Sequence, residues 1–168
     1  MKKIGIYYGS TAGTTEEIAK TIATVLNVAD TDIHDVSNFS EESIDAYEVL
    51  LLGSSTWGEG DIQDDWFTVL QSLSKMDLSG KKVAFFGCGD SSSYPDSFCG
   101  AMGQMYNEIK DTGAKFIGSV STDGYTFDES EAVVDGKFIG LPLDEENEDE
   151  KSAKRITDWI ESIKPELN

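Results

Sequence analysis

The stretch KIGIYYGSTAGTTEEIAKTIATVL, residues 3–26, has the pattern of a strand, a loop and a helix. Lys3 to Gly9 is a short and almost continuous apolar run, which is typical of a buried strand. From Thr14 to Leu26 the apolar residues recur at helical spacing, at Ile18, Ala19, Ile22, Ala23 and Leu26. Such a unit is the repeating element of sheets with parallel strands.

The same alternation continues to the end of the chain. Further strands are predicted near Thr31–Val36, at Val49–Gly53, at Lys82–Gly87 and at Lys115–Ser119, the last continuing at Phe138–Leu141. Helical spacing recurs over residues 66–73, 98–109 and 156–163. Right-handed crossovers would place helices on both faces of one sheet. We therefore expect an α/β fold, a three-layer, doubly wound, five-stranded parallel sheet.

The length fits a single domain covering residues 1–168, without repeats or linkers. The segment from about Val120 to Asp135 interrupts the fifth strand, and its Thr122–Tyr125 stretch carries a turn signal.

The charge balance excludes some classes of partner. With 32 acidic and 13 basic residues the formal net charge is −19, which disfavours nucleic acid and anionic membranes. Partners should carry basic patches, although acidity can also simply keep a small protein soluble. The acidic run from Asp144 to Glu150 is interpreted as the solvated start of the last helix.

Other features of the composition point to a cytoplasmic protein. No apolar stretch has membrane-spanning length, and no secretory leader precedes the first strand. The two cysteines, Cys88 and Cys99, are too few for a disulfide framework and are expected to be reduced thiols. His34 is the only histidine and is interpreted as structural, and no catalytic or metal-ligating constellation stands out.

In parallel sheets of this kind ligands bind beyond the carboxyl ends of the strands, so three loops at this edge are candidates for a ligand-binding site. The first, residues 10–15, offers four hydroxyls and a glycine at a helix start, where free backbone N–H groups favour an anion. No Lys or Arg lies between Tyr8 and Ile18, so neutral hydrogen bonds to a monophosphate are expected. The alternative is an ordinary capping box formed by Thr14 and Glu17.

The second and third loops each present a large aromatic side chain. Residues 55–61 place Trp57 between a buried strand and two glycines, where it could form one wall of a ring-binding slot. Alternatively, Trp57 folds into the core or shares a cluster with Trp66. Residues 87–99 add Tyr94 among small polar residues. Two rings and a phosphate loop together describe a site for flavin mononucleotide, FMN.

From Ile4 to Trp159 the chain resembles the long-chain flavodoxins. The matching motifs are a phosphate loop at Gly9–Glu16, a tryptophan loop at Thr56–Gln63 followed by Asp65-Trp66, a tyrosine loop at Gly87–Asp90 with Tyr94 and Phe98-Cys99, and the insertion at Ser121–Tyr125. The resemblance implies the sheet order 2-1-3-4-5 with FMN at the switch point, an arrangement of which this family is a well-known example.

The resemblance also implies roles for individual residues. Ser10, Thr11, Thr14 and Thr15 would hold the phosphate, and Trp57 and Tyr94 would flank the isoalloxazine ring. Gly58 would lie beside the ring nitrogen N5, where a flipped peptide could accept a hydrogen bond from the reduced ring. Asp90, Ser97 and Cys99 would line the ring edge and ribityl chain. The expected cofactor site is completed by Ala12, Gly13, Ser55, Thr56, Gly60, Cys88 and Gly89.

Two positions depart from the family pattern. Ala12 stands where a hydroxyl is common, which could weaken FMN binding by about 1 kcal/mol. Gly58 stands where a bulkier residue is frequent, which should make the peptide flip easier.

The function implied is that of a monomeric, low-potential one-electron carrier that cycles between semiquinone and hydroquinone and substitutes for ferredoxin. Ferredoxin–NADP reductase or low-potential oxidoreductases would be its partners. The alternative is an FMN-dependent NAD(P)H:quinone-type reductase, for which the chain lacks a GxGxxG fingerprint and a basic cluster near the loops. A receiver domain is discounted because Gly9-Ser10-Thr11 replaces the acidic residues it needs.

Overall fold

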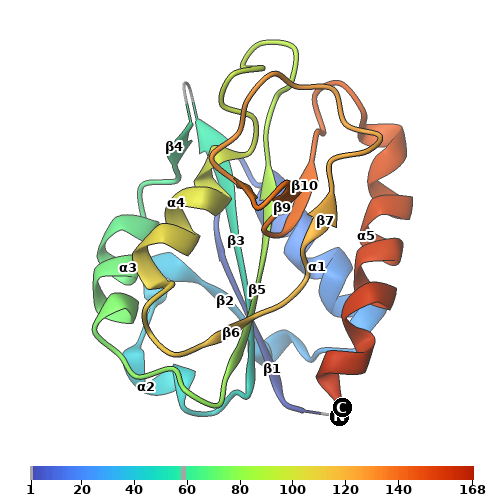
Figure 1. Ribbon diagram of the computed structural model, residues 1–168. Helices are drawn as coiled ribbons and strands as arrows, with labels where there is room; N and C mark the ends of the chain where they lie inside the picture. The colour runs from blue at the N-terminus through green and yellow to red at the C-terminus, as the bar shows by residue number, and fades with distance from the viewer. Residues whose placement is uncertain (1, 58–59) are drawn as a thin grey trace.

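The computed structural model describes residues 2–57 and 60–168. Its central sheet contains β1 (Ile4–Gly9), β2 (Ile33–Asp35), β3 (Val49–Trp57), β5 (Lys82–Cys88), β6 (Lys115–Phe116) and β10 (Leu141–Leu143). The helices are α1 (Thr14–Leu26), α2 (Glu41–Ile44), α3 (Trp66–Ser74), α4 (Gly100–Ile109) and α5 (Asp149–Ile163). Figure 1 shows the helices on both sides of the sheet.

The strands follow the predicted order. The sheet runs β10-β5-β3-β1-β2, with β6 pairing β5, and these pairs are all parallel. Because β5 is the fourth strand of this series and β6 and β10 are two parts of the fifth, the order is 2-1-3-4-5. The short β4 (Asp61–Ile62) is antiparallel to the end of β3.

The interruption of the fifth strand is confirmed, but its boundaries differ from the prediction. β6 ends at Phe116 and pairs with the start of β5, whereas β10 begins at Leu141 and pairs with its end. Residues 117–140, here called the insertion, carry a separate antiparallel sheet with the order β7-β9-β8. Phe138 therefore belongs to this small sheet and not to the fifth strand. The short strands of the insertion are β7 (Val120–Ser121), β8 (Val133–Val134) and β9 (Lys137–Phe138).

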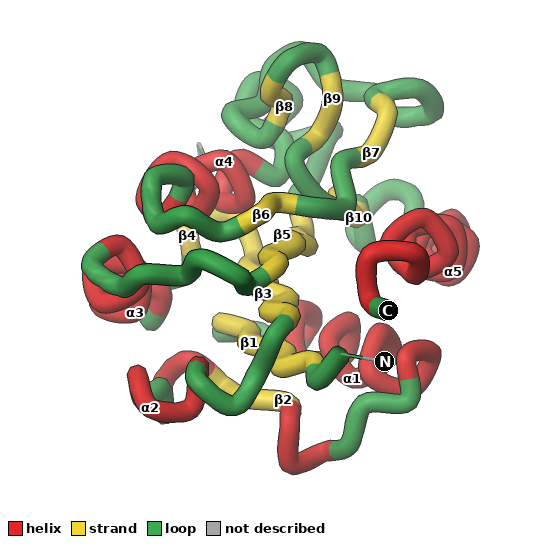
Figure 2. The backbone as a smooth tube through the Cα atoms, turned by 60° about the horizontal axis from the view of Figure 1, so that its bottom comes forward, coloured by secondary structure: helices red, strands yellow, loops and turns green. Residues whose placement is uncertain are grey.

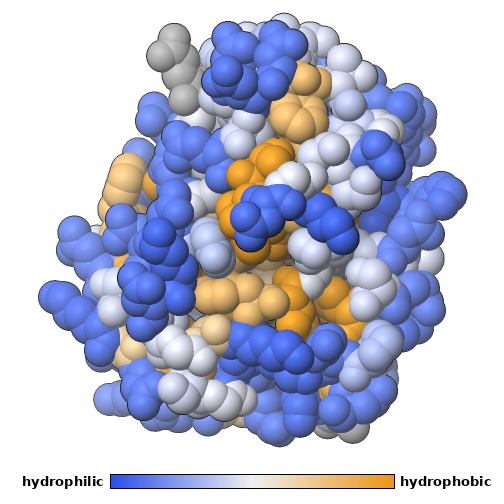
Figure 3. Space-filling view, in the orientation of Figure 1, coloured by the Kyte–Doolittle hydropathy of each residue, from blue (hydrophilic) through white to orange (hydrophobic). Residues whose placement is uncertain are grey.

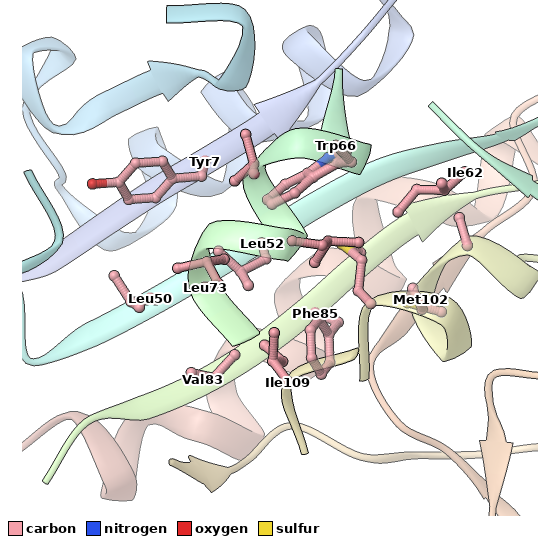
Figure 4. Close-up of a cluster of buried hydrophobic side chains, with 14 of the residues drawn as sticks. Tyr7, Leu50, Leu52, Ile62, Trp66, Leu73, Val83, Phe85, Met102 and Ile109 are labelled. Carbon is pink, nitrogen blue, oxygen red and sulfur yellow. The ribbon is translucent and has the colours of Figure 1, made fainter. Parts of the chain in front are cut away.

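Each face of the central sheet has its own core. Apolar side chains of α3 and α4 pack on one face, together with Leu52 and Phe85 of the sheet, as Figure 4 shows. Those of α1 and α5 pack on the other, with Leu51 and Phe86. Neighbouring residues of β3 and β5 thus point to opposite faces, because side chains alternate along a strand. Figure 2 shows the three layers, with α3 and α4 on one side and α1 and α5 on the other.

The remaining surface features concern membranes and hydropathy. Within the described residues, every helix is too short or too polar to cross a bilayer. On the face seen in Figure 3, hydrophilic residues predominate, and the apolar ones gather over the insertion and the neighbouring edge of the sheet.

Candidate functional site

A pocket of about 260 Å³ lies at the carboxyl edge of the sheet, among the loops that follow β1, β3 and β5. These are the three loops that the sequence indicated. All but two of the lining residues belong to the predicted site, the exceptions being Glu145 and Glu146. The lining comprises Ser10, Ala12, Thr14, Thr15, Ser55, Thr56, Trp57, Cys88, Gly89, Asp90, Tyr94, Glu145 and Glu146.

The first loop leaves the start of α1 open. Gly13 occupies the N-cap position with φ 92°, and no side chain of the described residues caps this helix. The Gly13 N–H donates instead to Ser10 Oγ at 2.9 Å. The capping-box alternative is therefore wrong, because Thr14 is already the first helical residue. The free amides and the positive end of the helix dipole remain suited to an anion.

Two hydroxyls of this loop are oriented differently. Thr15 is fully buried, and its Oγ1 lies 4.0 Å from Cys88 Sγ. Burial raises the pKa of the Cys88 thiol to about 12. Thr11 Oγ1 accepts a hydrogen bond from Gln63 Nε2 at 3.3 Å. Thr15 and Cys88 thus form part of the pocket wall, whereas Thr11 joins the first loop to the second.

The second loop separates its two tryptophans. Trp66 is fully buried, and its Nε1 donates to the Gly53 carbonyl at 2.8 Å; Figure 4 shows it among the core residues. Trp57 is 44% exposed and lines the pocket. The core position therefore belongs to Trp66, and Trp57 is free to contact a ligand. Gly58, predicted beside the ring, lies outside the described residues.

Ser55 is the strongest sign that the pocket takes a polar ligand. Its Oγ is buried, and it is one of two such side-chain atoms in the described residues that have no hydrogen-bond partner. An unsatisfied buried hydroxyl costs roughly 1–3 kcal/mol, so a partner supplied by a ligand would remove this penalty. The neighbouring Thr56 Oγ1 already accepts from the Ala101 amide at 3.2 Å.

The third loop exposes Tyr94 beside a structured turn. Tyr94 is 42% exposed. Asp90 accepts hydrogen bonds from the amides of Ser92 and Ser93 at 3.1 and 3.0 Å, and from Asn147 Nδ2 at 2.9 Å. These donors, the Ser93 amide foremost, lower the pKa of the Asp90 carboxyl. Asp90 thus organises the loop as well as lining the pocket.

The segment after β10 also reaches the pocket, which the sequence interpretation missed. Asp144 is fully buried and accepts hydrogen bonds from Ser91 Oγ and from Asn147 Nδ2, the latter at 2.9 Å. Glu145 and Glu146 follow it in the pocket lining. The interpretation of this run as a solvated helix start is wrong for Asp144, and α5 begins only at Asp149. The signal was available, because the end of the fifth strand meets the same edge of the sheet.

Several predicted site residues do not line the pocket. They are Thr11, Gly13, Gly60, Ser97 and Cys99. Cys99 is fully buried at the start of α4, with its Sγ 3.9 Å from the Gly87 carbonyl oxygen. Gly60 has φ 107°, and a Cβ there would lie 3.3 Å from Ser97 Cβ, so these two residues pack against each other.

The environments of the two cysteines and of His34 agree with the prediction that the cysteines are thiols and that His34 has a structural role. Both cysteines are free thiols. His34 lies on β2, with its ring stacked on Tyr7 at 4.7 Å and its Nε2 2.7 Å from the Tyr47 hydroxyl. Burial lowers the pKa of His34. Within the described residues, no cluster of His, Cys, Asp or Glu is arranged to hold a metal ion.

The pocket combines two half-exposed aromatic rings, an uncapped helix start and an unsatisfied hydroxyl. A planar apolar ring can stack between aromatic faces, and an anion can bind at the helix start. Among the described residues, no Lys or Arg lines the pocket, so the anion would be held by neutral donors. This donor set fits a ligand with a flat ring system at one end and a single phosphate at the other.

Comparisons with known proteins agree with this chemistry. A family model described as Flavodoxin matches residues 6–159. Flavodoxin 1 of Azotobacter vinelandii is 42% identical, over 99% of this chain and 98% of the relative. The flavodoxin of Synechocystis is also 42% identical, over 99% of each chain. A crystal structure of Fusobacterium nucleatum flavodoxin bound to flavin mononucleotide has a TM-score of 0.90 and 37% identity, with 100% of both chains covered.

Proposed function

Since the chain belongs to the flavodoxin family, we propose that it is an electron carrier that binds FMN non-covalently in the pocket at the carboxyl edge of the sheet. FMN supplies one-electron redox chemistry when it is bound. The observation that carries the proposal is the pairing of Trp57 and Tyr94, both half exposed, on one pocket with an uncapped helix start.

The first loop would hold the phosphate. Ser10, Thr14 and Thr15 line the pocket at the start of α1 and bring hydroxyls to the same place as its free amides. Hydrogen bonds from such neutral donors to a charged acceptor are worth about 1.5–3 kcal/mol each. Thr11 would contribute by tying this loop to Gln63.

The second and third loops would hold the ring system. Trp57 and Tyr94 would contact its faces, each contact worth roughly 0.5–1.5 kcal/mol beyond the area buried. Ser55 would find its missing partner on the polar edge of the ring or on the ribityl chain. Gly58 remains a predicted contact of the ring, and Asp90 of its edge.

Acidic residues around the pocket support a low reduction potential for the second of the two one-electron steps. Asp90, Glu145 and Glu146 all line the pocket, and the net charge is −19. One carboxylate about 10 Å from an added negative charge opposes it by roughly 1.7 kcal/mol at an effective dielectric of about 20. Several carboxylates together would make the addition of a second electron unfavourable.

The charge distribution supports docking to basic surfaces near the pocket. Residues 4–19, 21–74, 83–109, 116–136 and 138–150 contain no Lys or Arg, and they include the loops that follow β1, β2, β3, β5 and β10. Lys2, Lys3, Lys81, Lys82 and Lys115 instead lie where strands begin, at the opposite edge. This asymmetry would orient the pocket toward a basic partner.

Ferredoxin–NADP reductase and low-potential oxidoreductases are the partners we predict, and their binding should weaken as salt rises. A single domain spanning residues 1–168, acting as a cytoplasmic monomer without nucleic-acid or membrane partners, is part of this proposal. Family membership favours a carrier over the NAD(P)H:quinone-type reductase.

The test is stepwise reduction of the purified protein with dithionite while absorbance is recorded. We expect a yellow protein that passes through a distinct one-electron stage before it bleaches. A colourless protein that takes up no added FMN would contradict the proposal. Bleaching in one two-electron step, with steady oxidation of NADPH by the protein alone, would favour the reductase.

A further inference from the structure

The second and third loops meet where Gly60 lies against the start of α4. A Cβ at Gly60 would lie 3.3 Å from Ser97 Cβ, and a Cβ at Gly100 would lie 3.5 Å from Gly60 Cα. Ser97 belongs to the third loop, and Gly100 is the first residue of α4. Figure 1 shows β4, which follows Gly60, beside α4. The loops that carry Trp57 and Tyr94 are therefore in direct contact at these three residues, here called the seam.

Two hydrogen bonds from α4 hold the second loop on both sides of Trp57. The Ala101 amide donates to Thr56 Oγ1 at 3.2 Å, and Gln104 Nε2 donates to the Gly60 carbonyl oxygen. The Gly60 amide donates in turn to the Trp57 carbonyl oxygen at 3.2 Å. Gln104 is thereby linked, through a single residue, to the backbone of the exposed tryptophan.

Gln104 lines a groove of about 390 Å³ between α3 and α4, away from the cofactor pocket. Its side chain is half-buried, whereas Asn107, one turn further along α4 and in the same groove, is exposed. In the part of the chain that the structure describes, only the first of these two carboxamides bonds to the second loop. The contact across the seam therefore depends on one side chain, which a substitution can remove without touching the pocket lining.

The spacing between the two exposed rings depends on this contact between their loops. Trp57 and Tyr94 are both half-exposed and both line the pocket. Core packing therefore holds each ring only in part, and its position follows the backbone of its loop. Since the two loops meet at the seam, a bond that fixes Gly60 against α4 also fixes the distance between the two aromatic walls.

We propose that Gln104 is a positioning residue for the flavin ring: by bonding the Gly60 carbonyl it holds the second loop against the third and sets the spacing between Trp57 and Tyr94. The inference rests on the proposed function, because the ring must bind between these two side chains. Its physical basis is pre-organisation, since a loop that is already held on both sides loses less conformational freedom when a ligand binds. The effect belongs to the ring end, because the phosphate end is built from the first loop and α1.

The experiment measures the dissociation constants of FMN and of riboflavin for the wild-type, Gln104→Met and Asn107→Leu apoproteins by quenching of flavin fluorescence. Riboflavin has the same ring without the phosphate, so it reports on the ring end alone. Gln104→Met keeps the volume of the side chain and removes the donor. We expect it to raise both dissociation constants by the same factor, about fivefold, the equivalent of one neutral hydrogen bond. Asn107→Leu, the matched control in the same groove, should leave both unchanged.

A double-mutant cycle shows whether the effect acts through Trp57. In a Trp57→Ala background the fivefold effect of Gln104→Met should disappear, because the wall that Gln104 positions is gone. An equal effect in both backgrounds would overturn the inference. So would an effect on FMN without one on riboflavin, or no effect of Gln104→Met in the first place.

Two further outcomes are kept apart from these. If Gln104→Met does not fold, as thermal unfolding of the apoprotein would show, Gln104→Glu is measured in the same cycle, because it keeps the shape of the side chain and its carboxylate cannot donate to the Gly60 carbonyl. Wild-type protein that binds neither flavin would refute the proposed function itself, whereas wild-type binding with no effect of the Gln104 variants would refute only the role of Gln104.

Discussion

The side-chain amide of Asn147 donates to Asp90 Oδ1 at 2.9 Å, which joins the segment after the fifth strand to the loop after β5. The same Nδ2 donates to the buried Asp144, also at 2.9 Å. Two loops far apart in sequence are thereby held together at the edge of the pocket. Asp90 is the residue through which this junction responds to pH.

The Asp90 carboxylate should stabilise the apoprotein in a pH-dependent way. Its donors lower its pKa in the folded state below the ordinary value of 3.8. A lowered folded-state pKa means that the stabilisation is fully present above the ordinary pKa and is lost as the pH falls through the folded value. Asp90→Asn should therefore be less stable than wild type near neutral pH, and the difference should shrink in acid.

The measurement is the free energy of unfolding by urea at a series of pH values, for wild type, Asp90→Asn and Asn147→Ala. Asn147→Ala removes one of the donors and should give a smaller version of the same profile, because the Ser92 and Ser93 amides remain. A difference between wild type and Asp90→Asn that stays constant with pH would refute this assignment.

Removing either exposed ring of the pocket should weaken FMN binding. Trp57→Ala and Tyr94→Ala each lose a stacking contact of roughly 0.5–1.5 kcal/mol together with buried area, so the dissociation constant should rise about tenfold or more. Phe67→Ala is the control, since Phe67 is 55% exposed but does not line this pocket. Equal effects of all three substitutions on a fluorescence titration would mean that the rings do not hold the cofactor.

Ser55→Ala should affect stability and binding in opposite directions. In the apoprotein it removes a buried hydroxyl that has no partner, so unfolding should cost the same or up to about 1 kcal/mol more. FMN binding should weaken about fivefold, because the variant can no longer offer the hydrogen bond. Thermal unfolding of the apoprotein and FMN titration give the two values. A destabilised variant with normal affinity would be evidence against a contact with the ligand.

The cysteine thiols should resist alkylation in the folded protein. Burial raises the pKa of Cys88 to about 12 and raises that of Cys99 well above its ordinary range. Because only the thiolate reacts appreciably, iodoacetamide near pH 8 should modify both residues slowly until urea unfolds the chain. Mass spectrometry with and without urea gives the extent of modification. Rapid labelling of Cys88 under native conditions would show that the pocket wall opens in solution.

Most of the fold was accessible from the sequence because its signals are local. Buried strands are short apolar runs and covering helices have a 3.6-residue period, so β1, β3, β5, α1 and α5 could be recognised one at a time. Their alternation then restricted the topology, since parallel strands need crossovers of one hand. The loops at the ligand edge followed from the same reasoning, and eleven of the predicted positions line the pocket.

Which way a side chain points, and which residues it contacts, were decided only by the tertiary structure. Whether Trp57 or Trp66 enters the core depends on packing between α3 and the sheet, and whether Thr11 faces the pocket depends on Gln63. No local pattern marks Asp144 as buried, because its donors, Ser91 and Asn147, come together only once β5 and β10 are paired.

The insertion shows the same division most clearly. The sequence determined that the fifth strand is interrupted, because its apolar run is broken by a turn signal. It could not indicate that residues 128–130 bind the turn after Tyr94, since those bonds join residues some thirty positions apart. Periodicity and composition are properties of neighbouring residues, whereas the shape of the pocket depends on contacts that exist only in the folded chain.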